Sequence, residues 1–259
     1  MADYDTSDLQ RWDERIREKA DEFGLSCYPQ EFEICDHNQM LGYMAYSGMP
    51  SHYPHWSYGK NYEKLKTLYD YGISGLPYEM VINANPALGY LMRGNTLALQ
   101  ILTMAHVYGH NDFFKNNMMF SKTRPEFTIY MFKIQGMRIE CFIEDPSIGI
   151  DRVEKFIDAA HSVALQCNRN VLMRVETREE QKKRLINAAR PVNDPFFRIH
   201  ERQKYTEPDL HKIPLEPEDN LLLFIRDYNP RLAEWEKDIL TIVHDQTQYF
   251  LPQIETKIM

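Results

Sequence analysis

A chain of 259 residues that is 43% hydrophobic and 12% aromatic is long and apolar enough to bury one large core or two small ones. This composition argues against disorder over most of the chain. The formal net charge of -8 at pH 7 argues against a general affinity for nucleic acid or anionic membranes, so we expect small molecules or proteins as partners.

Targeting signals and cysteine motifs are absent from the sequence. It holds no run of about 18 apolar residues, so we expect no membrane span. The segment before Leu25 lacks the basic start and apolar run of a secretory signal. The four cysteines form no C-x-x-C pair, which is typical neither of a disulfide framework nor of a zinc knuckle. These features predict a cytoplasmic protein.

The first part of the chain predicts two helices around one strand. An apolar stripe of helical spacing begins after Ser7. The stretch "YPQEFEICD" alternates like a strand, with Phe32 and Ile34 on one side. A second helix opens at Asp36 or Asn38. The stretch "SHYPHWSYGKNY", residues 51–62, then predicts an aromatic loop, because prolines and a glycine punctuate it.

Three stronger helical patterns follow. The first starts at Thr96 and continues to Phe113. The second starts near Phe127 and ends before Pro146, and Asp151 can cap the third. We expect these three helices to form the centre of the fold.

The remaining sequence predicts a three-part organisation. Residues 1–172 form a helical core domain, residues 173–228 a charged linker and extended loop, and residues 229–259 the start of a further helical segment. The last pattern is still amphipathic at Met259, which predicts that it continues in a longer protein. The expected fold class is mainly α: a helical domain with long irregular loops and at most a small strand element.

The stretch "AHVYGHNDFFKNN" carries two histidines, His106 and His110, one helical turn apart. Their side chains lie about 40 degrees apart around a helix, so both imidazoles can reach one ion. The spacing matches the H-E-x-x-H helix of zinc hydrolases, but Val107 replaces the glutamate of that motif. Because Leu102 and Phe113 share their side of the helix, we expect both histidines on an inward face.

Other candidate metal ligands lie on neighbouring elements. Glu79 stands in an apolar run, where a carboxylate needs a partner. Asp158 and His161 repeat the acid-x-x-His spacing of helical di-metal sites, so they could share a cavity with His106 and His110. The expected cofactor is a divalent metal such as zinc. The alternative is that the histidines are hydrogen-bonded core residues and that the acids only favour a helix start.

Candidate substrate-binding residues occur in two stretches. His55, Trp56 and Lys60 could form a polar and aromatic wall that stacks a ring and contacts an anion. The same rings could instead pin a loop to the domain. Asn111 and Asn116, beside the histidine pair, are further candidates for substrate binding.

Several long stretches resemble one protein family. "GMPSHYPHWSYGKNYE", "YEMVINANPALGYLM", "AHVYGHNDFFKNN", "DAAHSVA" and "WEKDILTIVHDQTQYFLPQIETKIM" occur in the order and spacing of the stage V sporulation protein R (SpoVR) family, in its N-terminal half. The resemblance implies a role in forming spore cortex peptidoglycan, or a stress function in bacteria that do not sporulate. It also implies an Asn-Glu-Gly-Trp-Ala stretch beyond Met259, where a third metal ligand could lie.

Two hypotheses of different class follow. In the first, the protein is a metal-dependent hydrolase that acts on a cell-wall precursor, with Glu79 activating water. In the second, it is a non-catalytic assembly or regulatory factor that acts through a protein partner. Imidazole nitrogens that converge on one point favour the first hypothesis, and histidines bonded to carbonyls or tyrosines favour the second.

Overall fold

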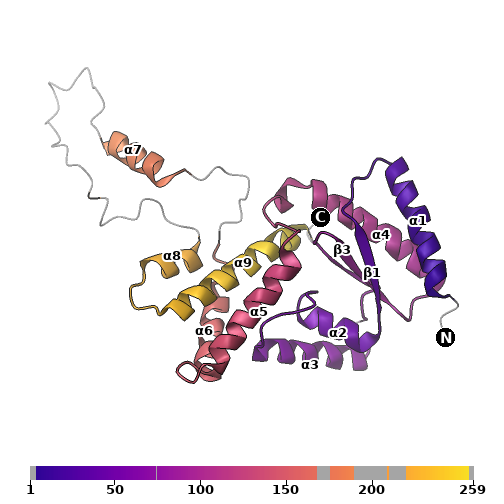
Figure 1. Cartoon of the computed structure of the whole chain (residues 1–259), viewed down its shortest axis with the longest axis horizontal. Coiled ribbons are helices and arrows are strands. Elements are labelled where there is room, and N and C mark those ends of the chain that lie inside the picture. Colours follow the sequence, from indigo (N-terminus) through magenta and orange to yellow (C-terminus); the bar gives the residue numbers. More distant parts are fainter. Residues whose placement is uncertain (1–3, 74, 168–175, 190–208, 210–219, 257–259) are drawn as a thin grey trace, which may run out of the picture.

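The computed structural model describes residues 4–73, 75–167, 176–189, 209 and 220–256. Helices dominate this part of the chain, and its strands form one small three-stranded sheet (Figure 1). The mainly α fold expected from the sequence is therefore confirmed. None of the described helices is long and apolar enough to cross a membrane.

The described part of the chain contains the helices α1 to α9, and its three strands all precede α4. In chain order the elements are α1 (Thr6–Glu22), β1 (Gln30–Cys35), α2 (His37–Ala45), α3 (Trp56–Asp70), β2 (Glu79–Ile82), β3 (Ala87–Met92), α4 (Leu97–Asn116), the 3-10 turn η1 (Met118–Phe120), α5 (Thr128–Glu144), α6 (Ile150–Val163), α7 (Arg178–Ala189), α8 (Leu221–Tyr228) and α9 (Glu234–Thr256). The strand predicted around Phe32 and the helix predicted after Asp36 are both confirmed.

The sheet has the order β1-β3-β2, with β3 in the centre. β1 runs parallel to β3, and β2 runs antiparallel to it. Gly89 of β3 lies opposite Phe32, and a Cβ on this glycine would lie only 2.9 Å from a carbon of the Phe32 ring. The small central residue therefore lets an aromatic ring cover the middle of the sheet.

Helices cover both faces of the sheet. Neighbouring residues of a strand point to opposite sides, so Tyr90 and Leu91 of β3 show which helices lie on each face. Tyr90 of β3 packs in a core cluster with Met40 of α2 and Phe132 of α5. The next residue, Leu91, packs in a different cluster with Leu9 of α1 and Met104 of α4. Helices therefore pack on both sides of the sheet, and α4 contacts β2 and β3.

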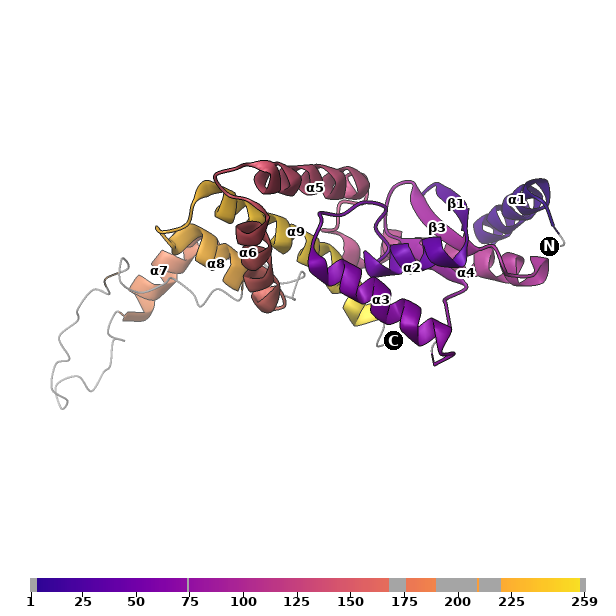
Figure 2. The ribbon, with the colours of Figure 1, turned by 90° about the horizontal axis from the view of Figure 1, so that it is seen from below.

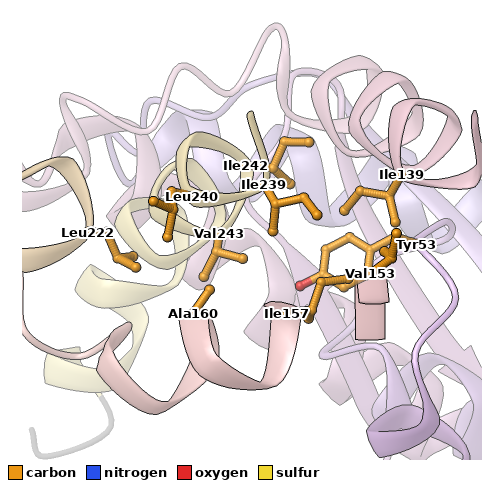
Figure 3. Packing of buried hydrophobic residues seen from close by; sticks show 10 residues of the cluster. All are labelled: Tyr53, Ile139, Val153, Ile157, Ala160, Leu222, Ile239, Leu240, Ile242 and Val243. Carbon is orange, nitrogen blue, oxygen red and sulfur yellow. The ribbon is translucent and has the colours of Figure 1, made fainter. Parts of the chain in front are cut away.

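A second core lies among the helices α5, α6, α8 and α9 (Figure 3). Ile157, Leu222 and Ile239 are fully buried in it. Tyr53, from the segment before α3, inserts its ring into the same core. The expectation that helices 96–113, 127–145 and 151–164 form the centre together is wrong, because α4 packs on the sheet and α9 packs with α5 and α6.

The predicted aromatic loop at residues 51–62 is also corrected by the structure. Only its first part is irregular, since α3 begins at Trp56 with His55 as its N-cap. Tyr58, Leu65 and Leu68 form a half-buried stripe of helical spacing. Proline and glycine marked this stretch as a loop, but Pro54 precedes the helix and Gly59 is tolerated within it.

The region predicted as a charged linker and extended loop contains two described helices, α7 and α8. Leu222 of α8 has no exposed surface and belongs to the helical core. The stretch predicted as extended loop, residues 202–219, lies outside the described residues except for Asp209. The division of the chain into three parts stays a prediction.

Candidate functional site

Glu79, His106 and His110 come together at the junction of β2 and α4. Glu79 is the first residue of β2, opposite Leu91 of β3, and both histidines lie on α4. The two Nε2 atoms are 2.9 Å apart, and Oε1 of Glu79 is 3.7 Å from Nε2 of His106. The three ligand atoms all lie within 4.8 Å of one another. Among the described residues, no other three side chains of His, Cys, Asp or Glu converge in this way.

These distances can be compared with those around a small divalent ion. An ion that is bound tetrahedrally at about 2.0–2.2 Å separates neighbouring ligand atoms by about 3.3–3.6 Å. The two distances around Nε2 of His106 fall on either side of that range. Two imidazoles and one carboxylate also form a ligand set that catalytic zinc sites use. The donor chemistry therefore fits a metal such as zinc, whereas the spacing is only close to the spacing that a bound ion would set.

His106 faces outward and His110 is half-buried, which corrects the inward face predicted for both histidines. The His106 side chain is 59% exposed, and Leu102 on the same side of α4 is 67% exposed. The buried side of α4 instead carries Gln100, Thr103, Met104, Val107, Tyr108 and Asn111. Apolar residues surround this helix on nearly all sides, so their spacing did not distinguish the side that packs on the sheet from the side that faces solvent.

Electrostatics keep at least one imidazole available as a ligand. Burial lowers the pKa of His110, and the nearby His106 lowers the pKa further. A neutral imidazole has a free lone pair, which metal binding requires. The Glu79 carboxylate is 22% exposed and brings the only negative charge of the three.

Asp158 and His161 do not join this cluster. Both oxygens of Asp158 accept hydrogen bonds from Nε1 of Trp56 at 3.1 Å, and Nε2 of His55 lies 3.4 Å from Oδ1. Nε2 of His161 is 2.7 Å from the hydroxyl of Tyr53. The structure therefore contains a second polar cluster, where the start of α3 meets α6.

This second cluster contains histidine–tyrosine contacts that sequence reasoning missed. Nε2 of His52 lies 3.0 Å from the hydroxyl of Tyr58, and the rings of Tyr58 and Tyr53 pack with their centroids 5.8 Å apart. Burial lowers the pKa of His52 to about 3 and that of His161 to about 4. The aromatic residues of "SHYPHWSY" carried this signal, but no spacing rule connects them to a histidine on a distant helix.

The predicted substrate-binding residues have mostly internal partners. His55 is 7% exposed, and Lys60 stacks over the Trp56 ring at 5.4 Å. Asn111 is fully buried, and its side chain bonds the backbone of Tyr28 on both sides. Asn116 donates to the carbonyl of Ser26. The two asparagines therefore fasten the segment before β1 to α4. Trp56, Lys60 and Asn116 are exposed, whereas His55 and Asn111 are buried.

The comparisons with known proteins agree with the resemblance seen in the sequence. A family profile described as "SpoVR like protein" matches residues 3–259. The chain belongs to the SpoVR-like family. A curated relative, "Uncharacterized protein YcgB" of Escherichia coli (strain K12), is 36% identical over 246 residues, which are 92% of this chain and 48% of YcgB. The chain thus spans about half the length of that relative. No solved structure matches this SpoVR-like chain.

The SpoVR-like chain also has a cleft that the sequence did not predict. Its volume is about 710 Å³, and it lies at the carboxyl ends of β1 and β3, where open α/β sheets commonly bind ligands. Its walls carry an acidic residue, Asp36, and a basic residue, Arg93. Tyr78 lines the cleft, but none of the three candidate metal ligands does. The cleft and the cluster around His106 are therefore different surfaces.

Proposed function

We propose that this SpoVR-like chain binds a divalent metal such as zinc through Glu79, His106 and His110, and that the bound metal serves hydrolysis. One observation carries the proposal: two imidazole nitrogens and a carboxylate oxygen converge within 4.8 Å at a solvent-facing position. A structural zinc site is closed by four protein ligands, whereas a catalytic site keeps one position open. The exposure of His106 supports an open site.

Each residue has a definite task in this proposal. His106 and His110 supply neutral lone pairs, and the lowered pKa of His110 favours the neutral form. Oε1 of Glu79 lies 3.7 Å from Nε2 of His106, so both atoms could bind the same ion. We therefore assign Glu79 to the ligand set instead of the water-activating role expected from the sequence. A divalent ion held there would act as a Lewis acid and lower the pKa of water.

The substrate class rests on the family and is part of the proposal. The resemblance to SpoVR proteins supports a substrate from cell-wall synthesis, and a cytoplasmic chain would meet it as a soluble precursor with an amide or glycosidic bond. The chain spans about half the length of YcgB, so this chain by itself does not define the activity of a protein of that length. We therefore propose metal binding for this chain and hydrolysis for the full-length protein in spore cortex formation or a related stress role.

Metal analysis tests the proposal directly. The chain is purified without a polyhistidine tag, equilibrated with zinc and desalted, and its metal content is measured by mass spectrometry. We expect close to one zinc per wild-type chain and little in H106A, H110A or E79Q. His37→Ala removes an exposed histidine outside the cluster and should keep the metal. Equal zinc in the wild type and all cluster variants would refute the proposal.

A second candidate function has its own support. His52 and His161 are bonded to tyrosines, the pattern expected of a non-catalytic factor with core histidines. Large apolar side chains are also exposed on α5, which favours a protein partner. Complementation of a deletion strain separates the candidates. An enzyme fails when Glu79 is replaced by Gln, whereas a factor that acts through a partner tolerates this change and fails when the exposed face of α5 is altered.

A further inference from the structure

The outer face of α5 carries an apolar stripe with strict heptad spacing. Its members follow one another at intervals of three and four residues: Phe127, Tyr130, Ile134, Met137 and Cys141. Phe127, Tyr130 and Met137 are 62%, 66% and 51% exposed, and Cys141 is exposed as well. Such a seam is the pattern by which one helix packs along another. In Figure 2, α5 runs along the edge of the molecule.

The other side of α5 is fully engaged, so the stripe is a separate surface. Phe132 and Ile139 have no exposed area and belong to the two cores. Gly136 lies against the backbone of His52. A side chain of the stripe can therefore change without removing the contacts that hold α5 in the fold.

We propose that the stripe is the contact surface of an antiparallel homodimer, in which α5 of one chain packs along α5 of a second chain. Charges beside the stripe identify this partner. The exposed Lys133 and Glu140 flank the same side of the seam, one heptad apart. When two α5 helices are antiparallel and overlap along their whole length, Lys133 of each chain faces Glu140 of the other.

Other arrangements of the same two helices place like charges together. A shift of one heptad in one direction brings Lys133 next to Lys133 of the partner, and a shift in the other direction brings Glu140 next to Glu140. A parallel pair in register places Lys133 against Arg138. Opposing like charges disfavour an arrangement. Full antiparallel overlap is thus the register that the charges select, and it also covers the complete stripe.

Charge reversal tests this dimer with the chain as it stands. Sedimentation measured over a range of concentrations gives the dimer dissociation constant. Each single reversal, K133E or E140K, creates two like-charge contacts and should raise that constant about tenfold. The double variant K133E/E140K restores both contacts and should return close to wild type. Lys155→Glu, on the exposed side of α6, is the matched control.

Cross-linking tests the orientation independently. In the antiparallel register Tyr130 faces Cys141 of the partner, so Tyr130→Cys should give a disulfide-linked dimer when oxidised glutathione accepts the electrons and protons of the two thiols. The wild type, with Cys141 alone, should not cross-link. A wild-type dimer linked through Cys141 would overturn the antiparallel register. A chain that stays monomeric up to its solubility limit, or a double reversal that fails to rescue, would overturn the proposal as a whole.

Discussion

The Nε2 atoms of His106 and His110 lie 2.9 Å apart on the outer face of α4, close enough to share a proton or an ion. We expect their common partner to come from solvent, because this face is exposed and Glu79 completes the group from β2. The helix therefore serves two purposes: its inner side holds the sheet, and its outer side presents ligands.

Zinc should stabilise the folded chain through this cluster. A ligand at about 100 times its dissociation constant adds about 2.7 kcal/mol to the unfolding free energy, if it binds only the folded state. We expect the melting temperature of the wild type to rise with added zinc and that of E79Q to rise much less. Thermal unfolding with zinc and with magnesium makes the comparison, since magnesium prefers oxygen ligands. An equal rise for E79Q would remove Glu79 from the ligand set.

The buried histidines should make the chain less stable in mild acid. Burial holds the pKa of His52 near 3 and that of His161 near 4 in the folded state, below the ordinary value of 6.5. The unfolded state therefore binds more protons below about pH 6.5, and each histidine lowers the unfolding free energy by up to about 1.4 kcal/mol per pH unit until its folded pKa is reached.

Denaturant unfolding between about pH 7 and pH 5 measures this slope. His161→Gln removes one titrating group, so its stability should depend less on pH than that of the wild type. His37→Gln makes the same substitution at an exposed histidine and serves as the comparison. Identical slopes for the wild type and the His161 variant would mean that His161 titrates normally in the fold.

Asn111→Ala should weaken the fold without affecting metal binding. The buried amide bonds the N–H and the carbonyl of Tyr28 and the side chain of Gln30. Removing it leaves buried polar groups unpaired, at a cost of about 1–3 kcal/mol each. Urea unfolding should show this loss, and Asn116→Ala, at an exposed position, should show a smaller one. A loss of zinc in Asn111→Ala, with stability unchanged, would instead favour a role at the site.

Leu222→Ala should show that α8 belongs to the helical core. The Leu222 side chain is fully buried against α6 and α9, and truncations of this kind cost about 2–5 kcal/mol. Phe224→Ala, at a half-buried position of the same helix, is the comparison. If both variants unfold at the wild-type urea concentration, α8 is not part of the cooperative unit.

Gly89→Ala should strain the sheet through a single contact. The added methyl group would lie 2.9 Å from the Phe32 ring, closer than carbon atoms normally approach. Overpacking of this kind costs about 1–3 kcal/mol. Phe32→Leu in the same chain should recover part of that loss, because it removes the ring. A double variant less stable than the sum of the two single changes would contradict this contact.

The sequence predicted the helices more reliably than their arrangement. Helical spacing located α4, α5 and α6, and the cap residue Asp36 located α2, because these signals depend on neighbouring residues. The predicted cap Asp151 is wrong, since Gly149 precedes α6 and Asp151 lies in its first turn. β3 was missed, since "ALGYLM" is a short apolar run buried on both faces and shows no alternation. Leu222 lies in a region interpreted as a linker, yet it belongs to the helical core. Its place there depends on residues far away in the sequence, which no local pattern predicts.

The sequence likewise predicted part of the candidate site correctly. Glu79 was identified because a carboxylate in an apolar run needs a partner, and the structure places it beside His106. Asp158 and His161 have the right helical spacing, but α6 belongs to the other core. Spacing within one helix predicts which side chains can act together, whereas the partner element depends on the tertiary fold.

The hydrogen bonds of His52 and His161 constrain where each ring can carry a proton. His52 accepts the backbone N–H of Tyr53 at Nδ1, so the neutral ring carries its proton on Nε2 and donates it to Tyr58. At His161, Nε2 lies 2.7 Å from the hydroxyl of Tyr53, so a neutral ring without a proton on Nε2 accepts that hydroxyl proton. A proton added to Nε2 would force Tyr53 to turn its hydroxyl around. The protonation of His161 and the orientation of the Tyr53 hydroxyl are therefore coupled.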